Sequence, residues 1–502
     1  MSGQQPARPA SQRRVPTGVA LLAAGMLLFL ASGQLGNKDE VGRLMTALSL
    51  INGQGFAVEI GPNTLGGSVG RNNLYFTPFE PAAPVLAAPF VWLGMAANLA
   101  SGPSYWPSVF AALPNIAITA ITAGIAALFA LELGASAVWA WLLALITVFG
   151  TVSLPYADSL YAEPLAALLI LLAAERTLAF ARSGTNARLL SAALAAGALA
   201  VVKLVTVALW PGFVLAWCYL LWQRGLAGRK RAAFAIAAAL AAGLILAAGY
   251  NVYRFGSPLK TGYQPHALGE PRTFSGEIPN GLRILLLSPG KSLFLYAPAV
   301  LAALPLLAGP LRRKLPWLAA LIAAQGLTFL LVIAKWSRPE GGYCFGPRLL
   351  LPVIPLLFAP LALAWEHGRL ARWGAAALGI LGFAINLAGA VTPFPLIAEG
   401  SPVPYYADSA NGYDPAFNPA GAIRAWASAT NVTRHLFRCA NEPGARVPLT
   451  GYLLPRWPFE LDWLPLHLAC DGWPPSIWLA GPALGATLAS AGAWLLRSRR
   501  AR

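Results

Sequence analysis

Charged residues are scarce in this chain. Asp, Glu, Lys and Arg make up only 11% of its 502 residues, whereas roughly 25% is usual for soluble proteins. Hydrophobic residues account for 57% of the chain, and the mean hydropathy is +0.59. This composition excludes an ordinary soluble domain and predicts a protein that is embedded in lipid.

Acidic residues are scarcer still, with 19 Asp and Glu against 36 Lys and Arg, so the formal net charge is +17. A charge of this size can indicate nucleic-acid binding. Here, however, the basic residues form short clusters between apolar runs, which is typical of the cytoplasmic loops that orient a membrane protein. We therefore expect membrane lipids as partners and no nucleic acid.

Cysteine is also rare, and the four cysteines have no metal-binding spacing. Cys218 lies in an apolar run. Cys439 and Cys470 share one long loop, and a disulfide between them is as plausible as two free thiols. No G-x-x-x-x-G-K-[ST] motif is present, which argues against coupling to ATP, and no inverted repeat typical of many transporters is visible.

Long apolar runs are abundant, and runs of about 17–25 residues are typical of transmembrane helices. The first follows Arg8, Arg13 and Arg14. We interpret it as an uncleaved helix, although Ala31-Ser32-Gly33 would also suit a signal-peptide cleavage site. The predicted spans are 16–33, 107–131, 135–153, 160–180, 188–202, 204–222, 232–253, 291–309, 315–334, 348–365, 372–392 and 475–496.

One further apolar run, 82–100, is ambiguous because it is short and contains Pro84 and Pro89. If it crossed the membrane, every later basic cluster would face outward, against the positive-inside rule. If it lies along the surface, the cytoplasmic loops contain nearly all clustered Lys and Arg. We therefore predict an all-α polytopic bundle of about twelve transmembrane helices with both termini cytoplasmic.

This topology places the long loops on the outer side, namely 34–106, 254–290, 335–347 and 393–474. We expect a transmembrane module over residues 1–392, whose first loop, 34–106, contains interfacial helices. A small periplasmic cap over 393–474 and a final helix with a basic tail over 475–502 complete the chain. Because the cytoplasmic loops are short, any chemistry is expected at the outer face.

Acidic side chains punctuate the apolar sequence where predicted spans begin or end. Asp39 and Glu40 follow the first span, and adjacent carboxylates there suit a general base or a cation site. Asp158 and Glu163 flank Tyr161 just before another span. Ionisable groups at such depth are costly and usually have a partner, although a solvated helix end is the simpler interpretation of each.

Basic and aromatic residues occupy the remaining outer segments. Lys203 interrupts a long apolar stretch, where it either neutralises a phosphate or extends to the lipid headgroups. Arginine and lysine suit phosphate, and aromatic faces suit sugar rings, but an aromatic belt with anchoring cations has the same composition. The further candidates in these segments are Arg254, Tyr263, Lys335, Tyr343 and Arg348.

Together these features resemble the GT-C superfamily of integral-membrane glycosyltransferases, above all the protein O-mannosyltransferases and the aminoarabinose transferases. The resemblance rests on Asp39-Glu40 after the first span, the Pro-rich helix in the same loop, Asp158 and Glu163, Lys203 on a short hairpin, and the run from Gly341 to Arg348. It covers about residues 16–365 as an arrangement of loose motifs. A large soluble domain, found in some relatives, is missing.

The resemblance implies an inverting transfer of a sugar from a polyprenyl-phosphate donor to an envelope glycan, lipid or protein, at the periplasmic face of a bacterial inner membrane. Asp39 would be the base and Glu40 would orient it. Lys203 and Arg348, helped by Lys335, would stabilise the departing phosphate. The sugar or acceptor pocket would contain Asp158, Glu163, Tyr161, Arg254, Tyr263 and Tyr343, and a divalent metal ion near the acids is an option that the family leaves open.

Two other classes remain open at this stage. A transporter or flippase of lipid-linked precursors would need ionisable residues in the middle of several spans, whereas the charges concentrate at the outer ends. A structural protein without activity would not require carboxylates and cations to meet.

Overall fold

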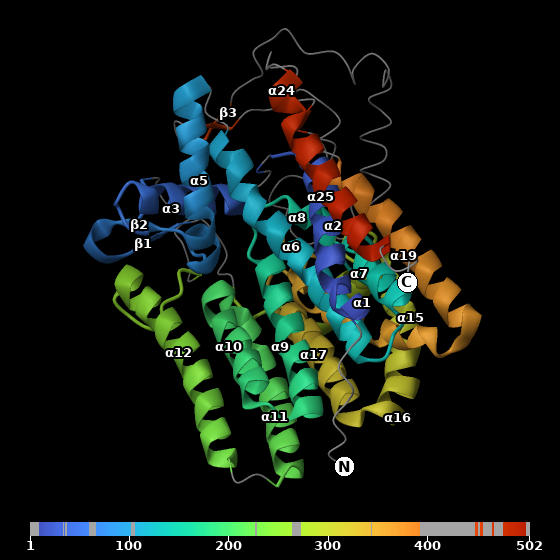
Figure 1. Cartoon of the computed structure of the whole chain (residues 1–502). Coiled ribbons are helices and arrows are strands. Elements are labelled where there is room, and N and C mark those ends of the chain that lie inside the picture. The colour runs from blue at the N-terminus through green and yellow to red at the C-terminus, as the bar shows by residue number, and fades with distance from the viewer. Residues whose placement is uncertain are drawn as a thin grey trace.

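The computed structural model describes residues 10–33, 35, 38–59, 67–101, 106–225, 228–263, 273–342, 344–391, 447–449, 452–454, 464–465 and 475–497. Over these residues the chain is an all-α polytopic membrane protein, with only two small two-stranded sheets. Helices dominate because a backbone in lipid must satisfy its own hydrogen bonds, and a helix does so within one segment. Figure 1 shows the arrangement.

Eight of the described helices are long and apolar enough to cross a membrane. The predicted spans at 16–33, 135–153 and 188–202 form shorter apolar helices, and the one at 291–309 is broken into several pieces. The membrane character of the chain is thus confirmed, while the count of about twelve spans stays a prediction. The eight are α6 (Trp106–Glu132), α9 (Glu163–Ser183), η2–α11 (Leu204–Gln223), α12 (Arg229–Phe255), α17 (Pro316–Lys335), η4–α18–η5 (Arg348–Trp365), α19 (Gly368–Ala390) and α24–α25 (Pro475–Leu496).

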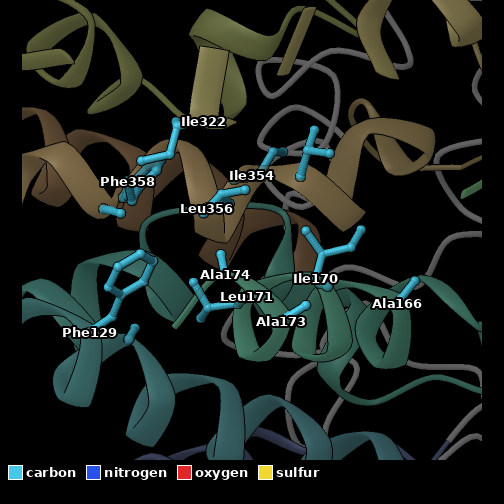
Figure 2. Close-up of a cluster of buried hydrophobic side chains, with 14 of the residues drawn as sticks. Phe129, Ala166, Ile170, Leu171, Ala173, Ala174, Ile322, Ile354, Leu356 and Phe358 are labelled. Atoms are coloured by element: carbon cyan, nitrogen blue, oxygen red, sulfur yellow. The ribbon is translucent and has the colours of Figure 1, made fainter. Parts of the chain in front are cut away.

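Helix α9 lies at the centre of the bundle. It packs against α6 on one side and against η4 (Arg348–Val353) and α18 (Ile354–Leu357) on the other. Alanines on α9 let its neighbours approach closely, as is common for helices packed in lipid. Figure 2 shows part of this core, with side chains of α6, α9, α17 and α18 meeting between the helices.

The first and last long helices of the chain are neighbours in space. Helices α2 (Val15–Leu30) and α25 (Ala480–Arg497) pack along each other through glycines (Figure 1). A Cβ atom at Gly485 would be 2.6 Å from the Gly25 carbonyl oxygen, and one at Gly492 would be 2.5 Å from that of Gly18. Gly18 and Gly25 are seven residues apart on α2, as are Gly485 and Gly492 on α25, so the glycines line one face of each helix.

Residues 38–59 and 67–101 form a subdomain beside the bundle. It contains α3 (Lys38–Ile51), β1 (Ser68–Val69), η1 (Arg71–Asn73), β2 (Tyr75–Phe76) and α5 (Ala82–Ser101). Strand β1 pairs antiparallel with β2, and α5 packs on α3 and α6. An apolar core of its own holds α3 against α5, so the acidic start of α3 has a fixed position. Nothing in this arrangement tests whether α5 lies along a membrane surface.

Three of the eight spans consist of several elements, among them η2 (Leu204–Leu209), α11 (Trp210–Gln223), η5 (Ala359–Trp365) and α24 (Pro475–Trp478). The other elements are α1 (Ala10–Arg13), α7 (Ala137–Phe149), α8 (Ser153–Ala157), α10 (Asn186–Val202), α13 (Ile278–Leu287), α14 (Leu293–Tyr296), α15 (Val300–Leu306), η3 (Leu307–Leu311), α16 (Arg312–Lys314), β3 (Val447–Leu449) and β4 (Tyr452–Leu454).

Candidate functional site

Four ionisable side chains from four distant segments meet in one place. Arg348 Nη1 lies 3.2 Å from Asp39 Oδ2, and Arg348 Nε lies 3.6 Å from Glu163 Oε1. Lys203 Nζ lies 2.7 Å from the same Glu163 oxygen. We call Asp39, Glu163, Lys203 and Arg348 the ion-pair cluster. The sequence-based expectation that these carboxylates and cations lie together agrees with this geometry.

Each member of the ion-pair cluster lies at the end of a helical element. Asp39 is in the first turn of α3 and Glu163 begins α9, where the positive end of the helix dipole favours a carboxylate. Lys203 ends α10 in extended backbone, and Arg348 begins η4. Charged residues tend to lie where apolar helices end, because they are costly inside the membrane. Four helix ends with charged residues can therefore lie close together.

Burial makes these pairs consequential. The Glu163 side chain is 2% exposed and that of Arg348 is 8% exposed. Removing one partner of such a buried pair leaves an uncompensated charge and typically costs about 3–5 kcal/mol. Because Glu163 contacts both cations, it is the residue on which the cluster depends.

Glu40 points away from the ion pairs into the protein. It is buried, and its Oε1 accepts a hydrogen bond from the Leu160 backbone N–H at 2.9 Å. Burial away from water raises the pKa of this carboxyl to about 8, although Leu160, Arg43 and Arg348 act in the opposite direction. Glu40 is therefore mainly protonated at neutral pH, and it fixes the loop before α9 rather than offering a base.

Tyr161 provides the aromatic surface of the site. The guanidinium carbon of Arg348 lies 4.3 Å from the centroid of its ring, a favourable cation–π geometry. Asn115 on α6 holds the loop that carries Tyr161, because its Nδ2 donates to the carbonyls of Ser159 and Tyr161, at 2.8 Å each. The structure thus places Tyr161 beside Arg348, and its predicted role in a sugar or acceptor pocket stays a prediction.

Asp158 is used by the protein itself. Its Oδ2 accepts hydrogen bonds from the backbone N–H of Ser32 at 2.5 Å, from Ser32 Oγ at 2.7 Å and from the backbone N–H of Gly33 at 3.0 Å. These bonds tie the loop after α8 to the end of α2. Asp158 therefore positions the segment that leads to α3, in addition to any contact with a ligand.

The remaining candidates lie elsewhere. Lys335 is exposed at the end of α17, and Tyr263 packs edge-to-face on Trp336 with ring centroids 6.1 Å apart. Arg254 donates to the Thr77 carbonyl at 2.6 Å. Tyr343, Cys439 and Cys470 lie outside the described residues, as does most of the proposed cap over 393–474.

Sequence reasoning missed two residues beside the ion-pair cluster. Glu80 Oε1 accepts a hydrogen bond from the Leu204 backbone N–H at 2.9 Å, directly after Lys203. Arg43 is buried on α3, four residues after Asp39, whose backbone carbonyl it contacts through Nη1 at 3.0 Å. Residues four apart share a helix face, and this spacing was the signal for Arg43.

Within the described part of the chain, no group of three His, Cys, Asp or Glu side chains is placed to hold a metal ion. Asp158 and Glu163, the two acids considered for this role, bind backbone N–H groups and cations instead. The role of a metal ion stays untested.

No family model matches this sequence, and no curated protein matches it. The resemblance to GT-C glycosyltransferases therefore rests on the quoted sequence residues alone and stays a prediction.

Proposed function

We propose that this protein is a membrane glycosyltransferase that moves a sugar from a polyprenyl-phosphate donor to a cell-envelope acceptor. The observation that carries the proposal is the ion pair of Asp39 with Arg348, which joins a carboxylate on α3 to a cation 309 residues away. A candidate base next to a candidate phosphate ligand is the minimum that such a transfer needs.

The proposed reaction is a single displacement. The acceptor hydroxyl forms a bond to the anomeric carbon while its proton passes to the Asp39 carboxylate. The bond between that carbon and the phosphate oxygen breaks, and its electron pair stays on the polyprenyl phosphate. Arg348 and Lys203 stabilise this developing charge, and cations in a partly dry site are effective in that role.

An outward orientation of the ion-pair cluster is supported by the opposite ends of the same helices. Helix α9 begins at Glu163 and reaches Arg182, and the paired helix α10 begins near Arg188 and ends before Lys203. Away from the cluster, Lys314 Nζ lies 2.9 Å from Glu366 Oε1. Because basic loops favour the cytoplasm, we propose that the cluster faces the periplasm, that both termini are cytoplasmic, and that about twelve segments cross the membrane.

Mid-span polar groups bear on the transport alternative. The side chain of Gln325 on α17 donates to the Leu209 carbonyl at 3.1 Å, and that of Asn386 on α19 donates to the Tyr296 carbonyl at 2.9 Å. Glu175, deep in α9, is paired with Arg176. These groups bind the protein itself and form no row of sites across the described spans, so we favour transfer over transport.

Turnover by the purified protein tests the proposal directly. Full-length protein in detergent is mixed with a panel of polyprenyl-phosphate sugars and an envelope extract, and release of polyprenyl phosphate is measured. We expect Asp39→Asn to abolish release while the protein still folds, with a lower melting temperature because Arg348 loses one of its two carboxylate partners. Full activity in Asp39→Asn would remove Asp39 from the mechanism, and no release by the unaltered protein with any donor would overturn the function.

Labelling of introduced cysteines tests the topology. In a background without the native cysteines, a cysteine at Thr261 is expected to react with an impermeant maleimide added outside the cell. One at Gly228 is expected to react only after permeabilisation. Reaction of the Gly228 variant in intact cells would invert the proposed orientation.

A further inference from the structure

Arg43 is a buried cation at the edge of the ion-pair cluster. It is 5% exposed, and its guanidinium carbon lies 4.0 Å from the centroid of the Phe79 ring and 5.6 Å from that of Tyr161. Among the described residues it makes one hydrogen bond, the donation to the Asp39 carbonyl, and its Nε is buried without a hydrogen-bond partner there. An arginine has five N–H donors, so most of its binding capacity is unused.

The charges around Arg43 are already engaged with other groups. Glu163 pairs with Lys203 and Arg348, and Asp39 pairs with Arg348. Glu40 and Glu163 lie close enough to feel the charge of Arg43, but among the described residues neither forms an ion pair with it. A buried charge without an opposite charge is costly, and proteins seldom keep one without a purpose.

The aromatic rings of Phe79 and Tyr161 and the burial of the side chain limit the positions that the Arg43 guanidinium can take. A fixed, planar guanidinium is pre-organised for two parallel hydrogen bonds to a phosphate or carboxylate. Asp39, the candidate base, is one helical turn away. An anion bound at Arg43 would therefore lie beside the reacting groups.

We propose that Arg43 is the specificity-determining residue that recognises the phosphate ester of the lipid-linked donor, an inference that rests on the proposed function. Arg43 is the cation of this site whose charge the protein leaves for a ligand. Lys203 and Arg348 are neutralised in the resting protein, and they act on the phosphate only as its negative charge grows. Recognition of the donor and stabilisation of the leaving group are thus assigned to different residues.

Binding of two matched lipids separates charge recognition from lipid binding. The full-length protein in nanodiscs is titrated with a polyprenyl phosphate and with the polyprenol of equal chain length, and the shift in melting temperature is recorded. We expect the protein to bind the phosphate at least about tenfold more tightly than the alcohol. Arg43→Met keeps an apolar stem against Phe79 and is expected to lose this preference, with affinity for the alcohol unchanged.

Two further variants keep the test decisive. Arg43→Lys retains the charge but not the planar fork, so it is expected to keep part of the preference, and it serves if Arg43→Met fails to fold. Lys260→Met removes an exposed cation that belongs to neither the ion-pair cluster nor the predicted phosphate ligands, and it is expected to retain the full preference, which controls for the loss of one positive charge.

The outcomes distinguish the two levels of the proposal. If the unaltered protein does not prefer the phosphate over the alcohol, the proposed function itself fails. If it does and Arg43→Met retains the preference, only the role of Arg43 is overturned. Inorganic phosphate that stabilises the protein as strongly as the lipid, at equal concentration, would overturn the assignment to a lipid-linked donor.

Discussion

Two buried arginines contact the same short segment, 77–79, and differ in how far the protein uses them. Arg254, at the end of α12, donates to the carbonyls of Thr77 and Phe79 at 2.6 and 3.3 Å and to Asn251 Oδ1 at 2.8 Å. Arg43 stacks on the Phe79 ring and makes a single hydrogen bond, to the Asp39 carbonyl. Both are at most 5% exposed, so burial alone does not separate them.

The difference indicates how to tell a structural cation from a functional one in this protein. Both guanidinium groups rest on aromatic rings, and in both the Nε is buried without a hydrogen-bond partner among the described residues. Arg254 uses both of its Nη atoms, on two backbone carbonyls and on Asn251, and so holds α12 against residues 77–79. Arg43 uses Nη1 alone. The number of engaged Nη donors, rather than charge or depth, is the property that assigns their roles.

The largest effect is expected at Arg254. Arg254→Met leaves the Thr77 carbonyl and Asn251 Oδ1 without the Arg254 donor, while the Phe79 carbonyl keeps its hydrogen bond from the Tyr250 hydroxyl. Such bonds to a charged group contribute about 1.5–3 kcal/mol each. We expect a loss of at least about 3 kcal/mol in stability, seen as a lower melting temperature in detergent, with unchanged lipid preference in the folded fraction. A variant as stable as the unaltered protein would break the comparison with Arg43. Arg254→Lys, which keeps the charge but not the planar fork of donors, is the matched control.

Removing the carboxylate that pairs with Lys203 and Arg348 is expected to leave these cations available for an anionic ligand. Glu163→Gln frees Lys203 and weakens the hold on Arg348. We expect a loss of about 3 kcal/mol in stability, accompanied by tighter binding of polyprenyl phosphate, measured as in the Arg43 titration. If affinity for the phosphate falls with stability, ion-pair saturation does not control anion binding here. Glu366→Gln removes the carboxylate that pairs with Lys314 away from the cluster and is expected to leave affinity unchanged.

Protonation of Glu40 is expected to keep Arg43 available. Burial raises the pKa of Glu40 from an ordinary 4.5 to about 8, so the carboxyl is neutral at pH 7 and becomes a competing anion above pH 8. The affinity for polyprenyl phosphate should then fall several-fold between pH 7 and 9, by an amount comparable to the loss of one charged interaction. In Glu40→Gln we expect a flat profile over that range, and an identical fall in both proteins would exclude Glu40 as the cause.

Glu40 also makes the stability of the protein depend on pH, in the direction opposite to that of an acid in a salt bridge. A carboxyl whose pKa is raised on folding binds its proton more tightly in the native state, so its contribution is fully present below pH 4.5 and is lost as pH rises through about 8. Glu40→Gln should therefore gain stability relative to the unaltered protein as pH rises across this window. Melting temperatures at pH 5, 7 and 9 measure this difference.

The smallest effect is expected where a saturated acid is replaced by its amide. The hydrogen bonds from Ser32 and Gly33 all reach one oxygen of Asp158, and an asparagine offers such an oxygen. Asp158→Asn should change turnover by no more than about threefold, whereas Asp158→Ala should lose about 1–3 kcal/mol of stability. Abolished turnover in a stable Asp158→Asn protein would show instead that its charge is needed for catalysis.

The meeting of Asp39, Glu163, Lys203 and Arg348 was largely predictable. Each interrupts or ends an apolar run, and residues that end spans on one side of a membrane are confined to a thin layer, so few arrangements keep them apart. The prediction did not include Arg43, because only the adjacent acids Asp39 and Glu40 were considered in that part of the sequence. The prediction included Arg254 because the sequence of a basic, aromatic segment does not show whether its arginine binds a ligand or a backbone carbonyl.

The sequence by itself determined that this chain is a membrane protein and that many of its helices end at charged residues. It also determined which of those residues are candidates for a functional site. Apolar length and charge placement decide these matters locally, before any packing occurs. Only the tertiary structure decided that Arg254 binds the carbonyls of a loop 175 residues away, that Glu40 is buried against Leu160, and that Arg43 retains unused donors. Partners of a side chain depend on contacts between distant segments, and those contacts exist only after the helices have packed.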